Sequence, residues 1–210
     1  RKVAAHYRLN LRLVARVETV QRNDTGFVVT TGDAQYTTGT IILATGYYDV
    51  PRFLDIPGED LPHVSHYYDE AYKYTNMSVV VVGGANSAIE CALDLYRNGA
   101  DVTLVHKYDA LSKRAKYWIV PDLENRIKNE EVQAHFNSVV TRIEEGRLHI
   151  KSRENDGEKT LDADFVFLMT GYRPDADFLT KTGIRLEGES LIPVLNPDTF
   201  ESNVEGIYLA

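Results

Sequence analysis

The chain has 210 residues, of which 43% are apolar and 26% charged, so it can form one large globular domain or two small ones. Its formal net charge of −8 argues against a general nucleic-acid binder, because an acidic surface repels the phosphate backbone. No apolar run approaches the roughly 20 residues that span a bilayer, and a single cysteine, Cys91, excludes an intramolecular disulfide and a cysteine-cluster metal site. These features predict a cytoplasmic protein without nucleic-acid, membrane or metal partners.

An internal repeat organises the chain. One copy is LRLVARVETVQRNDTGFVVTTGDAQYTTGTIILATGYY, ending at Tyr48, and the other is VQAHFNSVVTRIEEGRLHIKSRENDGEKTLDADFVFLMTGYR, ending at Arg173. The pattern of apolar and polar residues in each copy predicts a meander of three strands. A continuous apolar strand follows the meander and runs straight into the tripeptide Thr-Gly-Tyr. The repeat therefore predicts two domains of one architecture. The two tripeptides are Thr45-Gly46-Tyr47 and Thr170-Gly171-Tyr172.

The two Thr-Gly pairs have two interpretations. Small residues after a buried strand let a ligand or a neighbouring backbone come close, which makes Thr45-Gly46 and Thr170-Gly171 candidate ligand contacts. Either pair can equally be a plain turn.

The segment after the first copy is punctuated by Pro51, Pro57, Gly58 and Pro62. Proline fits neither a helix interior nor a central strand, so residues 47–62 are expected to be extended chain that crosses between domains.

A βαβ unit lies between the two copies of the repeat. Its short connections are typical of a parallel sheet. The predicted elements are a strand over 78–82, a break at Gly83-Gly84, a helix over 85–98 that stops at Gly99, a second buried strand over 102–105 and a further helix over 121–128. The pattern predicts an α/β fold, in which a Rossmann-like domain with a parallel sheet and a β-meander is flanked by parts of a second, similar domain.

The strand-to-helix turn reads VVVVGGANSA and ends at Ala88. Gly83 allows a tight turn, Ala88 allows close helix–sheet packing, and the N–H groups of the first helical turn favour an anion by roughly 0.3–1 kcal/mol. Ala85 replaces the second glycine of the G-x-G-x-x-G/A pattern, and a turn without a ligand is the alternative. We expect a branched side chain at Gly83 to block a dinucleotide with little loss of folding. The candidate binding residues are Gly83, Gly84, Ala85, Asn86, Ser87 and Ala88.

The end of the second strand indicates which nucleotide would bind. An NAD site places an acidic residue there for the ribose 2′-hydroxyl. This chain instead has His106 and Lys107, followed by Lys113, Arg114 and Lys116. A cation attracts a 2′-phosphate, and one charge-assisted hydrogen bond contributes about 1.5–3 kcal/mol. The spacing favours NADPH, with a solvated basic loop as the alternative.

Three reactive side chains have simpler interpretations. Cys91 lies inside the predicted helix with no second cysteine, which favours a buried packing residue over a redox thiol. His63 and His66 flank the linker and are candidates for a place near a nicotinamide or flavin, although surface positions are favoured.

The segment ATGYYDVPRFLDIPGEDLPHVSHYYDEAYKYTNMSVVVVGGANSAIECALDLYRNGADVTLVHK, followed by KYWIVPDLENRI, resembles the thioredoxin-reductase-like flavoproteins. Among them it is most similar to the bacillithiol-disulfide reductases. The resemblance extends over the whole chain, and its most specific parts are the linker, GGANSA and KYWIVPD.

This resemblance implies an FAD-binding domain, residues 1–66 and 173–210, interrupted by an NAD(P)-binding domain, residues 67–172. It implies NADPH and FAD as cofactors, with the pyrophosphate of NADPH on the GGANSA turn. The 2′-phosphate would bind His106, Lys107 and Arg114, and Thr45-Gly46 would lie near the flavin nucleotide, with Gly206-Ile207-Tyr208 leading to the final FAD-binding strand.

Two elements of the family pattern are missing from this sequence. The first glycine loop for FAD would precede Arg1, and the acidic residue that follows GIYLA would come after Ala210, so we expect truncation at both ends. The Cys-x-x-Cys of thioredoxin reductases is replaced by the stretch from His66 to Asp69, which argues against thioredoxin as the acceptor.

The sequence therefore predicts an FAD/NAD(P)H-dependent oxidoreductase that passes a hydride from NADPH to FAD and on to a disulfide-type acceptor, such as a low-molecular-weight thiol disulfide. The catalytic residues stay unassigned, and a homodimer is left open. The alternatives are a flavin-dependent monooxygenase and a nucleotide-binding fragment without turnover.

Overall fold

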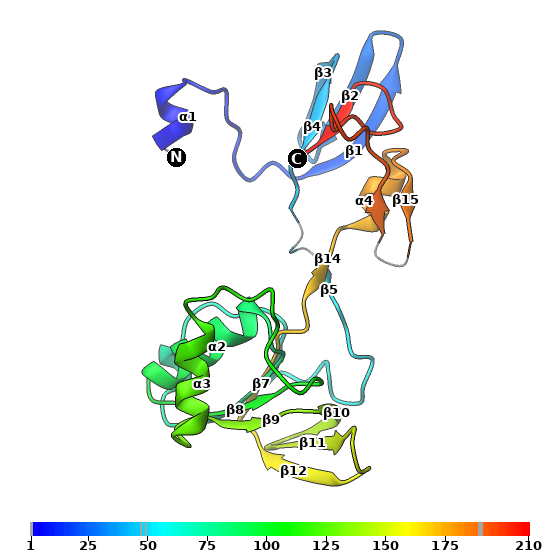
Figure 1. The fold of residues 1–210 in the computed structure, drawn as a ribbon. Coiled ribbons are helices and arrows are strands. Elements are labelled where there is room, and N and C mark those ends of the chain that lie inside the picture. The colour runs from blue at the N-terminus through cyan, green and yellow to red at the C-terminus, as the bar shows by residue number, and fades with distance from the viewer. Residues whose placement is uncertain (1, 47, 49, 189–190) are drawn as a thin grey trace. The chain divides into compact units, whose positions relative to one another are not determined.

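The computed structural model describes residues 2–46, 48, 50–188 and 191–210. The chain forms two compact units (Figure 1). The continuous unit is Pro51–Gly171, and the discontinuous unit joins Arg1–Val50 to Tyr172–Ala210. The continuous unit begins at Pro51, although the sequence predicted a domain boundary after residue 66. It begins there because apolar side chains of the linker and of the strand that follows it pack against an apolar cluster of that unit; they are Leu54, Ile56, Leu61 and Val64.

The continuous unit is built around a five-stranded sheet in the order β6-β13-β7-β8-β9. All neighbouring strands run parallel, which confirms the parallel sheet that the βαβ pattern predicted. The strands are β6 (Val64–Ser65), β7 (Ser78–Val82), β8 (Asp101–Val105), β9 (Gln133–His135) and β13 (Phe165–Leu168).

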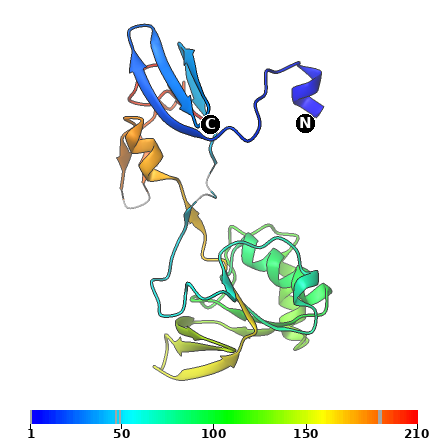
Figure 2. The same ribbon diagram turned by 180° about the vertical axis from the view of Figure 1, so that it is seen from behind.

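Helices cover one face of this sheet, and a β-meander covers the other (Figures 1 and 2). Successive residues of a strand point to opposite faces, and β7 shows this alternation. Val79 and Val81 join the cluster on the helix side, while Val80 and Val82 join the cluster on the meander side. The apolar run of β7 is continuous because both faces of its sheet are covered.

The two predicted helices lie close to their expected bounds, as α2 (Asn86–Arg97) and α3 (Val120–Lys128). The structure adds the short 3-10 helix η1 (Tyr72–Tyr74), which the sequence did not predict. The predicted inner face of α2, formed by Ala88, Ala92 and Leu95, is fully buried. Gly99 follows α2 with a φ of +82°, as expected of a helix stop.

The two copies of the repeat fold as two three-stranded antiparallel meanders, as predicted. The first hairpin of each meander contains one register shift, between Val17 and Thr19 in one copy and between Val140 and Arg142 in the other. The first meander is β1 (Val17–Asn23), β2 (Gly26–Thr31) and β3 (Ala34–Thr38), and the second is β10 (Ser138–Glu144), β11 (Arg147–Ser152) and β12 (Glu158–Asp162).

The discontinuous unit has its own core, which includes Phe27, Leu43, Leu179 and Ile207. Each meander is followed by an apolar strand in a parallel pair, here β4 with β17. Two short strands, β5 and β14, pair where the chain passes between the units. The remaining elements are α1 (Lys2–His6), β4 (Ile41–Leu43), β5 (Val50–Pro51), β14 (Tyr172–Arg173), α4 (Ala176–Lys181), β15 (Leu186–Glu187), β16 (Ile192–Pro193) and β17 (Ile207–Leu209).

Candidate functional site

The turn from β7 into α2 requires glycine at its first position. Gly83 has a φ of +148°, and a Cβ atom there would lie 2.5 Å from the Met169 carbonyl oxygen and 2.9 Å from the Ala88 Cβ. The predicted tight turn and close packing at Ala88 are both present. The expectation that a branched side chain at Gly83 would spare folding is wrong, because the side chain would collide with the backbone that follows β13.

The first turn of α2 has no side-chain cap. Ala85 is the N-cap residue and has extended backbone angles. The Asn86 side chain, which could have served the helix end, instead accepts a hydrogen bond from the Lys116 backbone N–H at 2.7 Å. Uncapped N–H groups and the positive end of the helix dipole together suit an anionic ligand such as a pyrophosphate.

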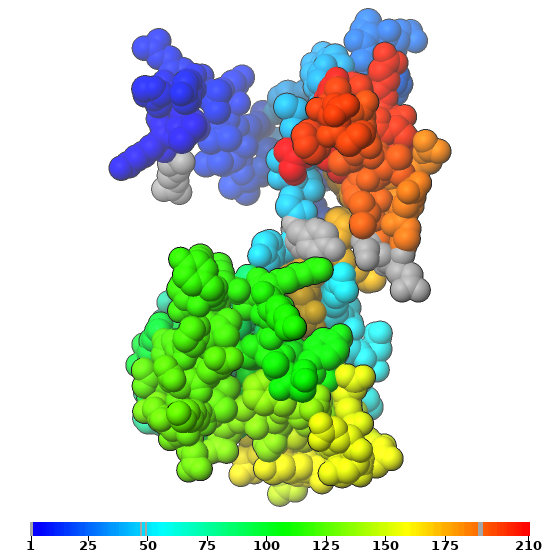
Figure 3. Space-filling view, in the orientation of Figure 1, coloured from blue at the N-terminus to red at the C-terminus, as the bar shows by residue number. Residues whose placement is uncertain are grey.

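The loop between β8 and α3 folds back over this helix end. The Ser112 N–H donates to the Gly84 carbonyl oxygen at 2.8 Å, and the Lys116 ammonium lies 2.5 Å from Glu90 on α2. Arg114 lies between these two tethers and is exposed. In Figure 3 this loop, coloured green, lies on the visible surface of the continuous unit. The fold therefore brings Arg114 toward the start of α2.

His106 is packed against the second glycine of the turn. A Cβ on Gly84 would lie 2.4–2.5 Å from the atoms of the imidazole ring, so the missing side chain makes room for His106. Burial, together with the charge of Lys107, lowers the pKa of His106, which keeps the ring neutral at pH 7. Its Nε2 atom is buried without a hydrogen-bond partner among the described residues. A neutral imidazole carries no positive charge, so His106 adds none to this sheet edge.

The Thr170-Gly171 turn lies at the same sheet edge as Gly83, because it follows β13 beside β7. The Thr170 hydroxyl donates to the Arg52 carbonyl oxygen at 2.6 Å, and the Arg52 N–H donates to the Gly171 carbonyl oxygen at 2.9 Å. Gly171 has a φ of +93°. The turn is thus held by the start of the linker, at the carboxyl ends of the parallel strands.

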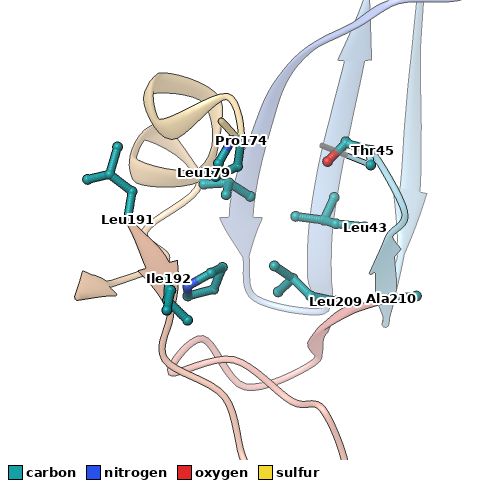
Figure 4. A pocket seen from close by; sticks show the side chains of 10 residues that line it. Leu43, Thr45, Pro174, Leu179, Leu191, Ile192, Leu209 and Ala210 are labelled. Atoms are coloured by element: carbon teal, nitrogen blue, oxygen red, sulfur yellow. The ribbon is translucent and has the colours of Figure 1, made fainter. Parts of the chain in front are cut away.

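Thr45 and Gly46 belong to the discontinuous unit. They line an apolar pocket of about 210 Å³ between β4, β17 and the chain near α4 (Figure 4). The other lining residues are Leu43, Pro174, Leu179, Leu191, Ile192, Pro193, Leu209 and Ala210, and none of the lining side chains is charged. Tyr47, the third member of this Thr-Gly-Tyr, lies outside the described residues.

The single cysteine is a packing residue, as predicted. Cys91 is a free thiol with 1% of its surface exposed, and burial raises its pKa well above the ordinary value. A thiol in this state is a poor nucleophile.

The surface position expected for His66 is wrong. Its ring is buried, and its Nε2 atom lies 3.2 Å from a Glu59 carboxylate oxygen. Glu59 also accepts the Leu54 N–H at 2.8 Å, so this contact holds the linker together. The Nε2 atom of His63 lies 3.1 Å from the Glu144 carbonyl oxygen. Both histidines therefore have structural roles.

Sequence reasoning missed two residues beside the end of β8. Tyr108 follows Lys107, and the Arg153 side chain reaches Lys107 from the second meander. The one available signal was the turn between the last two strands of that meander, which is longer in the second copy of the repeat than in the first.

Within the described ranges, no cluster of candidate metal ligands is present. In the same residues no helix is long and apolar enough to cross a membrane.

The chain resembles known proteins along its whole length. A family model described as pyridine nucleotide-disulphide oxidoreductase matches residues 1–210. Bacilliredoxin reductase Bdr of Bacillus subtilis (strain 168) is 42% identical over 187 residues, which cover 88% of this chain and 56% of that protein.

Two solved structures share the fold with a TM-score of 0.94. They are the bacillithiol disulfide reductases Bdr (YpdA) from Bacillus cereus, 37% identical, and from Staphylococcus aureus, 36% identical. Each match covers 100% of this chain and 65% of the other chain. The present chain thus spans little more than half the length of the curated reductase and about two thirds of these structures.

Proposed function

Because the chain belongs to the pyridine nucleotide-disulphide oxidoreductase family, we propose that it forms part of a flavoprotein that oxidises NADPH and reduces a disulfide. The continuous unit, Pro51–Gly171, is the NADPH-binding part, and the discontinuous unit contributes to the FAD-binding part. Bound NADPH would supply the hydride and FAD would accept it.

One observation carries the assignment of NADPH. An uncapped helix start, the basic loop tied over it and a strand end without an acidic residue all occur at one sheet edge. The turn from Gly83 to Ala88 fits a pyrophosphate, because the backbone N–H groups of the first turn of α2 have no partner within the helix. Lys107 and Arg114 fit a 2′-phosphate by charge, because both are cations beside the end of β8 and the start of α2.

The residues of the chain position and shield the nucleotide in this proposal. Gly83 and Gly84 shape the turn, while Asn86 and Ser112 hold the basic loop over the start of α2. Thr170-Gly171 borders the same edge and restricts the space beside the turn.

The flavin assignment rests on the discontinuous unit. The pocket beside Thr45 and Gly46 is apolar and has no charged side chain in its lining, which fits an uncharged part of FAD rather than its phosphates. The pair of β4 and β17 places Gly206-Ile207-Tyr208 next to the strand that leads into Thr45.

We further propose a low-molecular-weight disulfide as the acceptor. Two relatives are named for bacillithiol disulfide, and the stretch from His66 to Asp69 lacks the paired cysteines of a thioredoxin reductase. Cys91 is too buried to exchange with a disulfide. A cytoplasmic enzyme agrees with this single reduced, buried cysteine.

The test is a binding comparison of NADPH and NADH with the 210-residue chain. The parent should prefer NADPH, and the Lys107→Ala, Arg114→Ala double variant should lose about 1.5–3 kcal/mol of NADPH binding for each contact removed. NADH affinity should hardly change. The control is the Lys128→Ala, Arg147→Ala double variant, which removes the same charge from exposed positions on α3 and β11.

Two results would contradict the proposal. A parent chain that binds both nucleotides equally has no 2′-phosphate site, and an equal loss of both nucleotides in the double variant makes the two cations structural. The acceptor is tested separately in the whole protein, where bacillithiol disulfide, and not thioredoxin, should accelerate NADPH oxidation.

A further inference from the structure

The two meanders differ at one turn. In the first, Thr31 pairs with Ala34 across a two-residue turn. In the second, the last pair is Lys151 with Glu158, which leaves a longer turn between β11 and β12. Arg153 belongs to this longer turn, so the extra chain supplies a cation that the first meander has no room for.

Arg153 is held firmly beside the end of β8. Its backbone N–H donates to the Asn137 carbonyl oxygen at 2.7 Å, and the Asn137 N–H donates to the Tyr108 carbonyl oxygen at 3.0 Å. The Arg153 guanidinium in turn donates from Nη1 to the Lys107 carbonyl oxygen at 2.8 Å. These three hydrogen bonds connect the turn between β11 and β12 to Lys107 directly and to Tyr108 through Asn137.

The charged groups of Arg153 and Lys107 both lie near the aromatic ring of Tyr108. The Lys107 ammonium lies 5.2 Å and the Arg153 guanidinium 6.0 Å from the centre of the Tyr108 ring, which is 53% exposed. The ring stabilises both cations at an exposed site. A guanidinium has five N–H donors, and the bond to Lys107 uses one of them.

We propose that Arg153 is a specificity-determining residue that binds the 2′-phosphate of NADPH together with Lys107. This inference rests on the proposed function, since the 2′-phosphate must lie at the end of β8. Lys107 and Arg153 both bring positive charge to the end of β8, and a planar guanidinium binds a phosphate with two hydrogen bonds. The anchored turn holds Arg153 in place before the nucleotide arrives, which reduces the entropy lost on binding.

The experiment compares the parent chain with the Arg153→Ala and Arg147→Ala variants. Arg147 is the matched control, because it is exposed and begins the strand that Arg153 follows, at the opposite end of β11. The probes are NADPH, NADH and adenosine 2′,5′-bisphosphate. We expect Arg153→Ala to weaken NADPH and the bisphosphate about tenfold or more, with NADH changed less than about twofold. Arg147→Ala should leave all three affinities unchanged.

A second variant separates charge from anchoring. Arg153→Gln removes the charge but keeps a donor for the Lys107 carbonyl oxygen, so it should fold like the parent and still lose affinity for the two phosphate probes. Parent-like binding by Arg153→Gln, or an equal loss of NADH and NADPH, would overturn the role of Arg153 while the NADPH assignment stands. A parent that does not distinguish NADPH from NADH would instead refute the proposed function itself.

Discussion

At the scale of single residues, Gly83 and Gly84 lack side chains for different reasons. Gly83 has a left-handed backbone and faces the Met169 carbonyl oxygen, so the chain path itself excludes a Cβ there. Gly84 is required by its neighbour, since the His106 ring occupies the space of its side chain. The family resemblance implies that Gly83 and Gly84 both contact the dinucleotide, whereas in this fold both are also needed for packing.

We predict that Gly83→Ala lowers the free energy of unfolding by about 3 kcal/mol or more. Backbone strain and a 2.5 Å contact with a carbonyl oxygen act together at this position. Gly146→Ala is the control, because Gly146 also has a positive φ, +71°, but no atom within 4 Å of the added Cβ. Gly146→Ala should lower the free energy of unfolding by only about 1–2 kcal/mol. Urea unfolding of the parent, Gly83→Ala and Gly146→Ala chains measures both losses in free energy of unfolding. Equal losses in the two variants would show that the structure relieves the collision at Gly83 without penalty.

At the scale of elements, the β8–α3 loop and the start of α2 form one structure. The loop is tied to the turn through Ser112 and to the helix through the Lys116 backbone and its ammonium. Such tethers hold Arg114 near the helix start before any ligand binds. Asn86 therefore has a positioning role, in addition to the pyrophosphate contact that the family resemblance implies.

We predict that Asn86→Ala releases this loop. The lost hydrogen bond to the Lys116 N–H should cost about 0.5–1.5 kcal/mol of stability, and NADPH affinity should fall by about two- to tenfold. Hydrogen exchange of the Lys116 amide should accelerate. Ser87→Ala is the control for the exchange measurement, because Ser87 is the next residue along α2 and should leave that amide protected. Unchanged protection of Lys116 in Asn86→Ala would show that the loop does not depend on this bond.

At the scale of the whole molecule, the continuous unit contains two complete apolar clusters. One lies between the sheet and the helices and the other between the sheet and the second meander, and every buried member falls between Ala71 and Met169. A contiguous segment with its own core meets the usual requirements of a folding domain.

We predict that residues 51–171 alone fold cooperatively and bind NADPH within about twofold of the 210-residue chain, since the folding core and the proposed binding residues all lie in this segment. Thermal unfolding followed by circular dichroism, together with an NADPH titration, measures both properties. A gradual unfolding curve would contradict the assignment of an independent core. Cooperative unfolding with lost affinity would show that binding needs residues of the discontinuous unit.

The sequence alone determined the elements and their repetition. Period-two alternation, apolar β-branched runs and glycine or proline stops are local signals, so they predicted β7, α2 and β8 close to their observed bounds and both meanders by their three strands. The turn at Gly83 was predictable for the same reason. The NADPH assignment is still a prediction, because it depends on residue types at a spacing and not on a bound ligand.

Only the tertiary structure decided which distant residues meet at the sheet edge. Asn86 bonds to a backbone group 30 positions away, and Arg153 reaches a carbonyl 46 positions away. The burial of His66 against Glu59 was likewise hidden in a segment that resembles an exposed linker. Local periodicity carries no information about such contacts, because they depend on how loops from separate strands converge once the sheet has formed.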